Sequence, residues 1–159
     1  MLQEAGPGDV ILYENDLPDH YPYTSLIQPG GSDQMNATGR WAVVFGGPSP
    51  EHEISILTGL QAERILREAG HDVQPIYLAP SGAWVAVGAN TEAKDYLEGI
   101  PSGSKELDVR LGDQPGIFQE KGLGQKALDV DAALLCFLGG GGEGGGAAFV
   151  FEQLGIAHT

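Results

Sequence analysis

The amino-acid sequence predicts an α/β fold: an open, mainly parallel sheet in three layers, with helices on both faces. Two segments indicate this architecture. Residues 41–45 are a continuous apolar run that ends in the Gly46-Gly47 turn and leads into an amphipathic segment. The same order recurs from residue 131, where an apolar run at 131–138 is followed by a glycine loop and an apolar helix. We therefore expect the two glycine loops to be neighbours at the carboxyl ends of parallel strands.

A long helix is predicted after the first strand from its capping residues. Ser49 and Pro50 provide an N-cap and a proline at the first helical position. Glu51 and Glu53 add negative charge to the first turn, which the helix dipole favours, and Gly70 is expected to follow the helix as its C′ glycine. We expect the sheet-facing side of this helix to be formed by Ile54, Leu57, Ala62, Ile65, Leu66 and Ala69.

Accessory elements are predicted between the two strand–loop–helix units. Residues 72–78 form a second strand, in which Pro75 favours an edge position or a bulge. The remaining elements that we expect are a hairpin-like strand at 83–87, a short helix capped by Thr91 that ends near Glu98, and brief extended pieces near Val109 and Ile117 in a turn-rich region.

The second unit begins with residues 131–138, which predict a central strand of the sheet. The loop at 139–146 consists of glycine at every position except Glu143. Residues 147–154 follow as a helix, and residues 156–159 begin another strand. The order of these elements predicts an open, mainly parallel α/β sheet.

Composition restricts the classes of partner. A chain of 159 residues is long enough for one domain with a core, and eight basic against 22 acidic residues give a net charge of −14. Such a surface repels nucleic acid and anionic membranes, so we expect neither as a partner. No run approaches the ~18 apolar residues of a membrane span and no secretion signal is visible, so we expect a cytoplasmic protein. Cys136 lies in an apolar run and is expected to pack in the core.

Residues 1–40 differ in composition from the rest, with proline and glycine spread through them and no helical or strand period. We expect a poorly ordered or extended N-terminal extension, followed by one domain at 41–159. One interpretation is an upstream start, with a natural beginning near Met35. The other interpretation is a partner-binding arm that uses Tyr13, Tyr21 and Tyr23.

The two glycine loops form the candidate binding site. A Gly-Gly turn ahead of a helix can hold a phosphate, but neither loop has the lysine of a Walker motif. Glu51 and Glu53 in the first loop and Glu143 in the second suit a cation instead, such as a substrate ammonium group. In the alternative interpretation the acids only favour the helix dipole, His52 is an exposed helix residue and the glycines form a flexible loop. Adjacent helix positions point in different directions, so we expect no metal site there.

Three motifs resemble the D-alanine–D-alanine ligases of the ATP-grasp superfamily. Residues 41–55 resemble the family's opening strand followed by Gly-Gly-x-Ser-x-Glu-x-Glu-Val-Ser. Residues 137–146 resemble its His-Gly-x-x-Gly-Glu-Asp-Gly, and residues 151–159 resemble its Leu-Glu-x-x-Gly-Ile-Pro-Tyr-Thr. The resemblance covers about residues 41–159, with the motifs in the family's order and at its spacing.

The resemblance implies a Rossmann-like preATP-grasp domain of an enzyme that joins two D-alanines with ATP for peptidoglycan, the cell-wall polymer. It implies that Glu53, helped by Ser55, holds the ammonium group of the first amino acid. It also implies that the start of the first helix faces the acyl phosphate. The substrate-binding residues that it implies in the two loops are Gly46, Gly47, Ser49, Gly139, Gly142 and Glu143.

Two differences from the family leave the substrate open. Leu138 stands where the family has histidine, and Gly144 stands where it has aspartate. A ligase-like protein for a different amino acid is therefore an alternative. A second alternative is a non-catalytic binding or assembly module, which the acidic surface favours.

The resemblance places the ATP and magnesium sites in domains that lie beyond residue 159. We therefore expect no catalytic residue, no metal and no bound cofactor in this chain, which would be inactive alone. The expected partners are a D-amino acid and ATP-grasp domains, either in cis or as a separate chain. The resemblance leaves open whether the chain is a fragment or a natural subunit, and whether it forms a homodimer.

Overall fold

The computed structural model describes residues 39–112, 116–122 and 126–159, and for Gly142 and Glu143 it describes the backbone alone. The extension predicted at 1–40 therefore lies, apart from its last two residues, outside the described residues.

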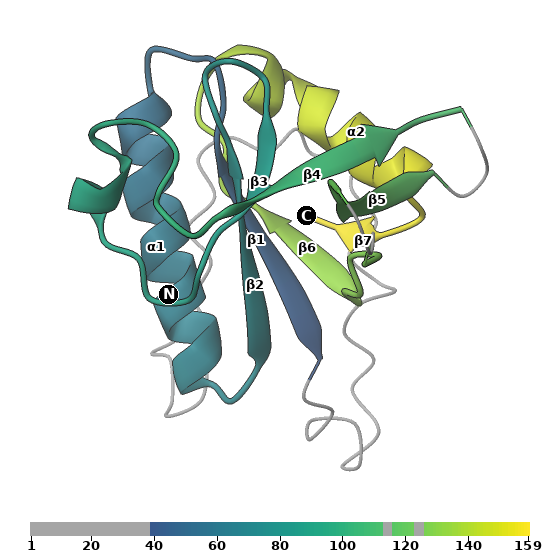
Figure 1. The fold of residues 1–159 in the computed structure, drawn as a ribbon, viewed down its shortest axis with the longest axis horizontal. Helices are drawn as coiled ribbons and strands as arrows, with labels where there is room; N and C mark the ends of the chain where they lie inside the picture. Colours follow the sequence, from purple (N-terminus) through teal and green to yellow (C-terminus); the bar gives the residue numbers. More distant parts are fainter. Residues whose placement is uncertain (1–38, 113–115, 123–125) are drawn as a thin grey trace, which may run out of the picture. The chain divides into compact units, whose positions relative to one another are not determined.

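One mixed sheet joins the seven strands of the described residues, in the order β5-β4-β3-β2-β1-β6-β7 (Figure 1). Strands β2, β1, β6 and β7 are mutually parallel, and β3, β4 and β5 continue the sheet with antiparallel pairing. The strands are β1 (Arg40–Gly46), β2 (Asp72–Leu78), β3 (Trp84–Ala86), β4 (Lys105–Arg110), β5 (Ile117–Glu120), β6 (Ala132–Leu135) and β7 (Ala157–His158). The predicted α/β fold is confirmed, and the expected extended pieces near Val109 and Ile117 are β4 and β5.

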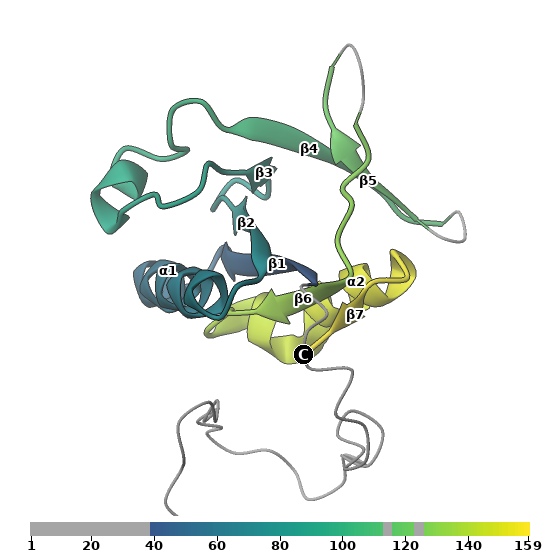
Figure 2. The same cartoon turned by 90° about the horizontal axis from the view of Figure 1, so that it is seen from below.

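Two helices cover opposite faces of the parallel strands. Alternate side chains of β1 enter two separate cores: Val43 and Phe45 pack with α1 (His52–Glu68), whereas Ala42 and Val44 pack with α2 (Ala147–Gln153). Figure 1 shows the two helices on either side of β1, and Figure 2 shows β4 and β5 turning away from the parallel strands. The three-layer arrangement follows from this alternation. Among the described residues, no helix is long and apolar enough to cross a membrane.

Helix α1 begins later than its sequence predicts. Its N-cap is Glu51 rather than Ser49, because the Ser49 hydroxyl donates a hydrogen bond to the carbonyl oxygen of Leu138 on the second loop. Its end is as predicted, since Gly70 has a φ of +90° and follows the helix as the C′ residue. The Gly70 and His71 N–H groups donate to carbonyls of the last turn, the pattern of a Schellman motif.

The buried side of α1 differs from the predicted one. Ile54, Leu57 and Ile65 are 54%, 52% and 45% exposed, so their predicted packing on the sheet is wrong, and only Ala62 and Leu66 of the predicted set pack against the core. Close approach explains the difference. A Cβ at position 59 would overlap the ring of Phe45, so a glycine is what allows α1 to lie against β1. The residues that α1 buries are Ser55, Ile56, Gly59, Leu60 and Glu63.

Pro75 occupies an interior strand, not the edge that its residue type predicts. Strand β2 lies between β1 and β3, and the carbonyl oxygen of Pro75 accepts a hydrogen bond from Val87 on the β3 side. In an extended strand, the N–H and the carbonyl of one residue point toward the same neighbouring strand. The missing N–H of Pro75 would face the Val87 carbonyl oxygen, and the Gln74 side-chain nitrogen donates to that oxygen instead, at 3.2 Å.

The remaining predicted elements are shorter than expected. The short helix is a 3₁₀ helix, η2 (Ala93–Tyr96), and its N-cap is Glu92 rather than Thr91. The Thr91 hydroxyl bonds the hydroxyl of Tyr96 instead. Strand β6 ends at Leu135, and the glycine loop contains a π-helical turn, η3 (Gly142–Gly146), that leads into α2.

Candidate functional site

The two glycine loops lie side by side at the carboxyl edge of the parallel strands. Strands β1 and β6 pair in parallel, with Val44 opposite Leu135, so both strands end at the same edge of the sheet. The Ser49 hydroxyl joins the loops through its 2.7 Å hydrogen bond to the Leu138 carbonyl oxygen. This arrangement confirms the prediction that the loops are neighbours.

A small hollow separates the loops. Its volume of about 20 Å³ is enough for a water molecule and too small to enclose an amino acid. Its lining residues are Gly46, Gly47, Pro48, Ser49, Leu78, Phe137, Gly139 and Gly141. The described residues around the two loops therefore do not enclose a pocket large enough for an amino acid.

The Gly46-Gly47 turn is a conformation that glycine alone adopts readily. Both residues have positive φ, +96° and +92°, and a Cβ at Gly46 would overlap the carbonyl oxygen of Leu78. The Gly47 N–H donates to that same oxygen at 2.7 Å. The turn is thus tied to the end of β2, and its backbone path does not depend on a ligand.

Ser55 links both loops from below. Its side chain is fully buried, and its hydroxyl accepts from the Gly46 N–H at 2.8 Å and donates to the Cys136 carbonyl oxygen at 2.7 Å. Both hydrogen-bonding functions are therefore used inside the protein. The structure places this predicted site residue beneath the loops, where it joins the ends of β1 and β6.

His52 holds the first loop against β2. Its Nδ1 lies 2.7 Å from the Gly47 carbonyl oxygen and its Nε2 lies 3.0 Å from the hydroxyl of Tyr77. A carbonyl only accepts, so Nδ1 carries a proton. Burial raises the pKa of Tyr77, which keeps its phenol protonated and able to donate. Sequence reasoning missed this role, because the pairing of β1 with β2 is what brings Tyr77 to His52.

Glu51 extends from the first loop to the second. A Cβ at Gly139 would overlap the carboxylate of Glu51, so the glycine leaves the space that this carboxylate occupies. Glu53 lies in the first turn of α1, and both it and Glu51 are exposed. The side chain of Glu143 is outside the described residues. No group of three or more histidine, cysteine or acidic residues that could hold a metal ion is present in the described part of the chain.

The second loop begins with two glycines of positive φ and continues as a helical turn. Gly139 and Gly140 have φ of +66° and +62°, and a Cβ at Gly140 would lie 3.2 Å from the Cβ of Ser49. The expected loop at 139–146 is thus partly helical, since η3 spans Gly142–Gly146 and Gly145 within it has a φ of +91°. Close packing of the two loops requires glycine at the first two positions.

Cys136 is buried in the core beneath the loops, as predicted. Burial raises the pKa of its thiol to about 12, so it stays protonated at neutral pH. A protonated, buried thiol is a packing group and not a nucleophile.

These features define a class of protein: an α/β domain whose two strand–glycine loop–helix units meet at the carboxyl edge of a parallel sheet, where open α/β sheets bind ligands. Residues 40–159 match the family model of the D-ala D-ala ligase N-terminus. The chain therefore belongs to the D-alanine–D-alanine ligase family, in which it corresponds to the N-terminal domain, and the predicted resemblance is confirmed.

Individual relatives agree with this assignment. The chain is 37% identical over 127 residues to a D-alanine–D-alanine ligase from Leptospira interrogans, covering 74% of this chain and 32% of the relative. It is 34% identical over 117 residues to one from Wolinella succinogenes, covering 70% and 31%. The crystal structure of a ligase from Helicobacter pylori has the same fold, with a TM-score of 0.59 and 24% identity over 76% of this chain and 35% of that one. The chain thus spans about one third of the length of these relatives.

Proposed function

We propose that this chain contributes the first amino-acid subsite and the acyl-phosphate loop of an ATP-dependent D-alanine–D-alanine ligase, which acts in the cytoplasm on peptidoglycan precursors. The observation that carries the proposal is the joining of the two glycine loops at one edge of the sheet in a member of this family. The ligase reaction phosphorylates the carboxylate of the first amino acid. The amine of the second then attacks the acyl phosphate, forms the amide bond and releases phosphate.

The ammonium group of the first amino acid would bind a carboxylate of the first loop. Glu53 is the residue that the family motif suggests, and Glu51 is the one whose carboxylate reaches the second loop. A charge-assisted hydrogen bond to either carboxylate would hold the amino acid over the loops and the first turn of α1. Both side chains are exposed, and Glu53 is the first candidate because the family motif suggests it. Ser55 would then act as a positioning residue, because its hydroxyl holds both loops.

The acyl phosphate would lie at the start of α1. Helix N-termini favour anions through free N–H groups and the helix dipole, and α1 is long enough, from His52 to Glu68, for that effect. An ammonium group on Glu53 and an anion at the helix start fit the two ends of one activated amino acid.

ATP and magnesium do not fit the described residues of the two glycine loops. Neither loop has a lysine, and the described residues contain no cluster of metal-ligating side chains. We therefore assign ATP and magnesium to ATP-grasp domains, in cis or as a separate chain. The small volume of the hollow supports this division, because a substrate would need a second wall.

Phosphate release tests the proposal. The chain would be joined to, or mixed with, the ATP-grasp domains of a relative, and phosphate would be measured with ATP and D-alanine. Release that requires this chain, ATP and D-alanine together is the expected result. A panel of other D-amino acids in the same assay tests whether Leu138, in place of histidine, changes the substrate. Binding of the ATP-grasp domains without phosphate release for any amino acid would contradict the proposal and favour the non-catalytic assembly module.

A further inference from the structure

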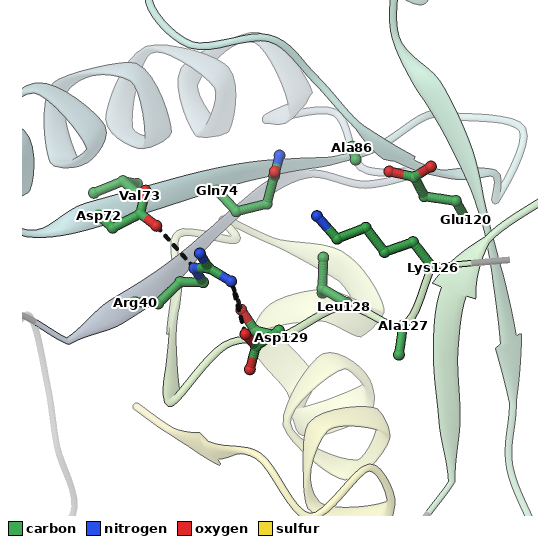
Figure 3. Close-up of a pocket in the computed structure, with 10 residues that line it drawn as sticks. All are labelled: Arg40, Asp72, Val73, Gln74, Ala86, Glu120, Lys126, Ala127, Leu128 and Asp129. Carbon is green, nitrogen blue, oxygen red and sulfur yellow. Dashed lines mark hydrogen bonds and ion pairs between the residues drawn. The ribbon is translucent and has the colours of Figure 1, made fainter. Parts of the chain in front are cut away.

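A second cavity lies at the opposite edge of the sheet, at the amino ends of β1 and β2 (Figure 3). Its volume is about 160 Å³, against about 20 Å³ for the hollow between the loops, which is room for a small organic molecule rather than a single water. The residues that line it are Arg40, Asp72, Val73, Gln74, Ala86, Glu120, Lys126, Ala127, Leu128 and Asp129. Neither the family motifs nor the proposed function uses this cavity.

One side of the cavity carries an excess of negative charge. The guanidinium of Arg40 is shared between two carboxylates: its Nε lies 2.8 Å from Asp72 and its Nη1 lies 2.8 Å from Asp129. The Arg40 backbone N–H donates to a third carboxylate, that of Asp131. One positive charge cannot neutralise two carboxylates, so oxygen atoms of Asp72 and Asp129 remain available to a cationic group.

The other side of the cavity carries a cation without a described partner. Figure 3 shows the Lys126 side chain extending toward the middle of the cavity, between Gln74 and Ala86. Two other lysines of the β4–β5 region form ion pairs, Lys105 with Glu120 and Lys121 with Glu106. Lys126 forms none with any described residue. Glu120, which also lines the cavity, binds the Lys105 ammonium through both oxygens.

The cavity also offers a neutral acceptor. The Gln74 side-chain nitrogen donates to the carbonyl oxygens of Pro75 and Val87, at 2.9 and 3.2 Å. These bonds fix the amide, and its oxygen is the group left to accept a hydrogen bond from a ligand.

We propose that this cavity binds a small zwitterion of the amino-acid class, with its carboxylate on Lys126 and its ammonium on Asp72 and Asp129. A zwitterion satisfies both unbalanced groups at once. The carboxylates of Asp72, Asp129 and Glu120 would repel a dianion such as phosphate. A simple cation would leave the Lys126 ammonium without an ion pair. A ligand without net charge is also not repelled by a protein of net charge −14. The site is independent of the proposed ligase function.

Affinity should be weak because the charged groups are partly in water. The side chains of Asp72 and Asp129 are 61% and 82% exposed, which screens their attraction for an ammonium group. We expect a dissociation constant in the millimolar range, about what a few exposed charge-assisted bonds provide.

Titration by NMR of the 159-residue chain tests the proposal. The probes are alanine, acetate and methylammonium at constant ionic strength, which present the zwitterion and each of its charged ends alone. Alanine should cause saturable shifts of the amide signals at 72–74 and 126–129, and acetate and methylammonium should each bind about tenfold more weakly because each lacks one charged contact. Absence of a saturable shift with alanine, or acetate binding as tightly as alanine, would overturn the proposal.

Two matched variants locate the site. Lys126→Gln should weaken alanine binding about tenfold, since it removes one charge-assisted bond. Lys121→Gln removes the same charge from the same region, but Lys121 lies outside the cavity. The affinity of this variant for alanine should therefore equal that of the unchanged chain. Equal affinity in Lys126→Gln and Lys121→Gln would contradict the proposal. The dispersion of the amide spectrum shows in the same experiment that each variant is folded.

Discussion

The carboxyl edge and the amino edge of the parallel strands satisfy their polar groups in different ways. At the carboxyl edge, Ser49, Ser55 and His52 bond backbone carbonyls of the loops and leave a hollow of about 20 Å³. At the amino edge, Arg40 and Lys126 lie among carboxylates around a cavity of about 160 Å³. The family motifs lie at the edge with the smaller space. Cavity size therefore does not locate the candidate site in this domain; the tied glycine loops do.

The largest effect on stability is expected from Ser55→Ala, at the carboxyl edge. The change leaves the Gly46 N–H and the Cys136 carbonyl without their buried partner, at about 1–3 kcal/mol each. The free energy of unfolding, measured in urea, should fall by about 2–6 kcal/mol. The control is Ser81→Ala, an exposed turn residue, which should change it by about 0.5 kcal/mol or less. Equal values for the two variants would contradict the role of Ser55 as the buried link between the two loops.

Alkaline pH should weaken the core beneath the carboxyl edge. Burial raises the pKa of Cys136 from 9.0 to about 12 and that of Tyr96 from 10.0 to about 12. The unfolded chain loses these protons at a lower pH than the folded chain. The free energy of unfolding should therefore fall as pH rises from 9.0 to about 12, by about 1.4 kcal/mol per pH unit for each group at the limiting slope.

Urea unfolding at a series of pH values measures this dependence. In Cys136→Ala the fall should begin about one pH unit later, near the ordinary pKa of 10.0 of Tyr96. A profile that is unchanged by this substitution would show that the Cys136 thiol does not stay protonated in the folded chain.

A smaller effect is expected from Ser49→Ala, because this hydroxyl is half-buried and the Leu138 carbonyl can turn to water when it is lost. Stability should fall by about 1 kcal/mol. The change should also shift the amide NMR signals of both glycine loops, with those at 72–74 as the unaffected control. Shifts confined to the first loop would mean that Ser49 does not join the two loops.

The smallest effect is expected at the amino edge, from Asp72→Asn. The ion pair with Arg40 is exposed on both sides, so the melting temperature should hardly change. Any difference from the unchanged chain should disappear when salt is added. A large loss of stability would contradict the view that charges at this edge are available to a ligand rather than engaged in holding the fold.

Local patterns predicted the parts of the fold that depend on neighbouring residues. The apolar run before Gly46 predicted β1, and Gly70 predicted the end of α1. The repeat of strand and glycine loop predicted that the loops meet. These features follow from backbone preferences, which a single sequence displays directly.

Long-range contacts decided the rest. Hydrophobicity placed Ile54 on the sheet side of α1, but Gly59 and Ser55 determine which side approaches β1, through steric fit and hydrogen bonding. The bond between His52 and Tyr77 depends on strand register, and a pattern search within one helix does not contain that information. The charged cavity at the amino edge joins residues from separate strands in the same way.

The central claim is that Glu53, in the first turn of α1, holds the substrate ammonium group. The most direct measurement compares Glu51→Gln with Glu53→Gln in the phosphate-release assay with the ATP-grasp domains present. Our account predicts that Glu53→Gln lowers kcat/KM for the first amino acid by about tenfold to a hundredfold, and that Glu51→Gln changes it by less than about threefold. Glu68→Gln, at the far end of α1, serves as the control for lost charge. Activity that is lost in Glu51→Gln but kept in Glu53→Gln would contradict the claim and assign the ammonium group to the carboxylate beside Gly139.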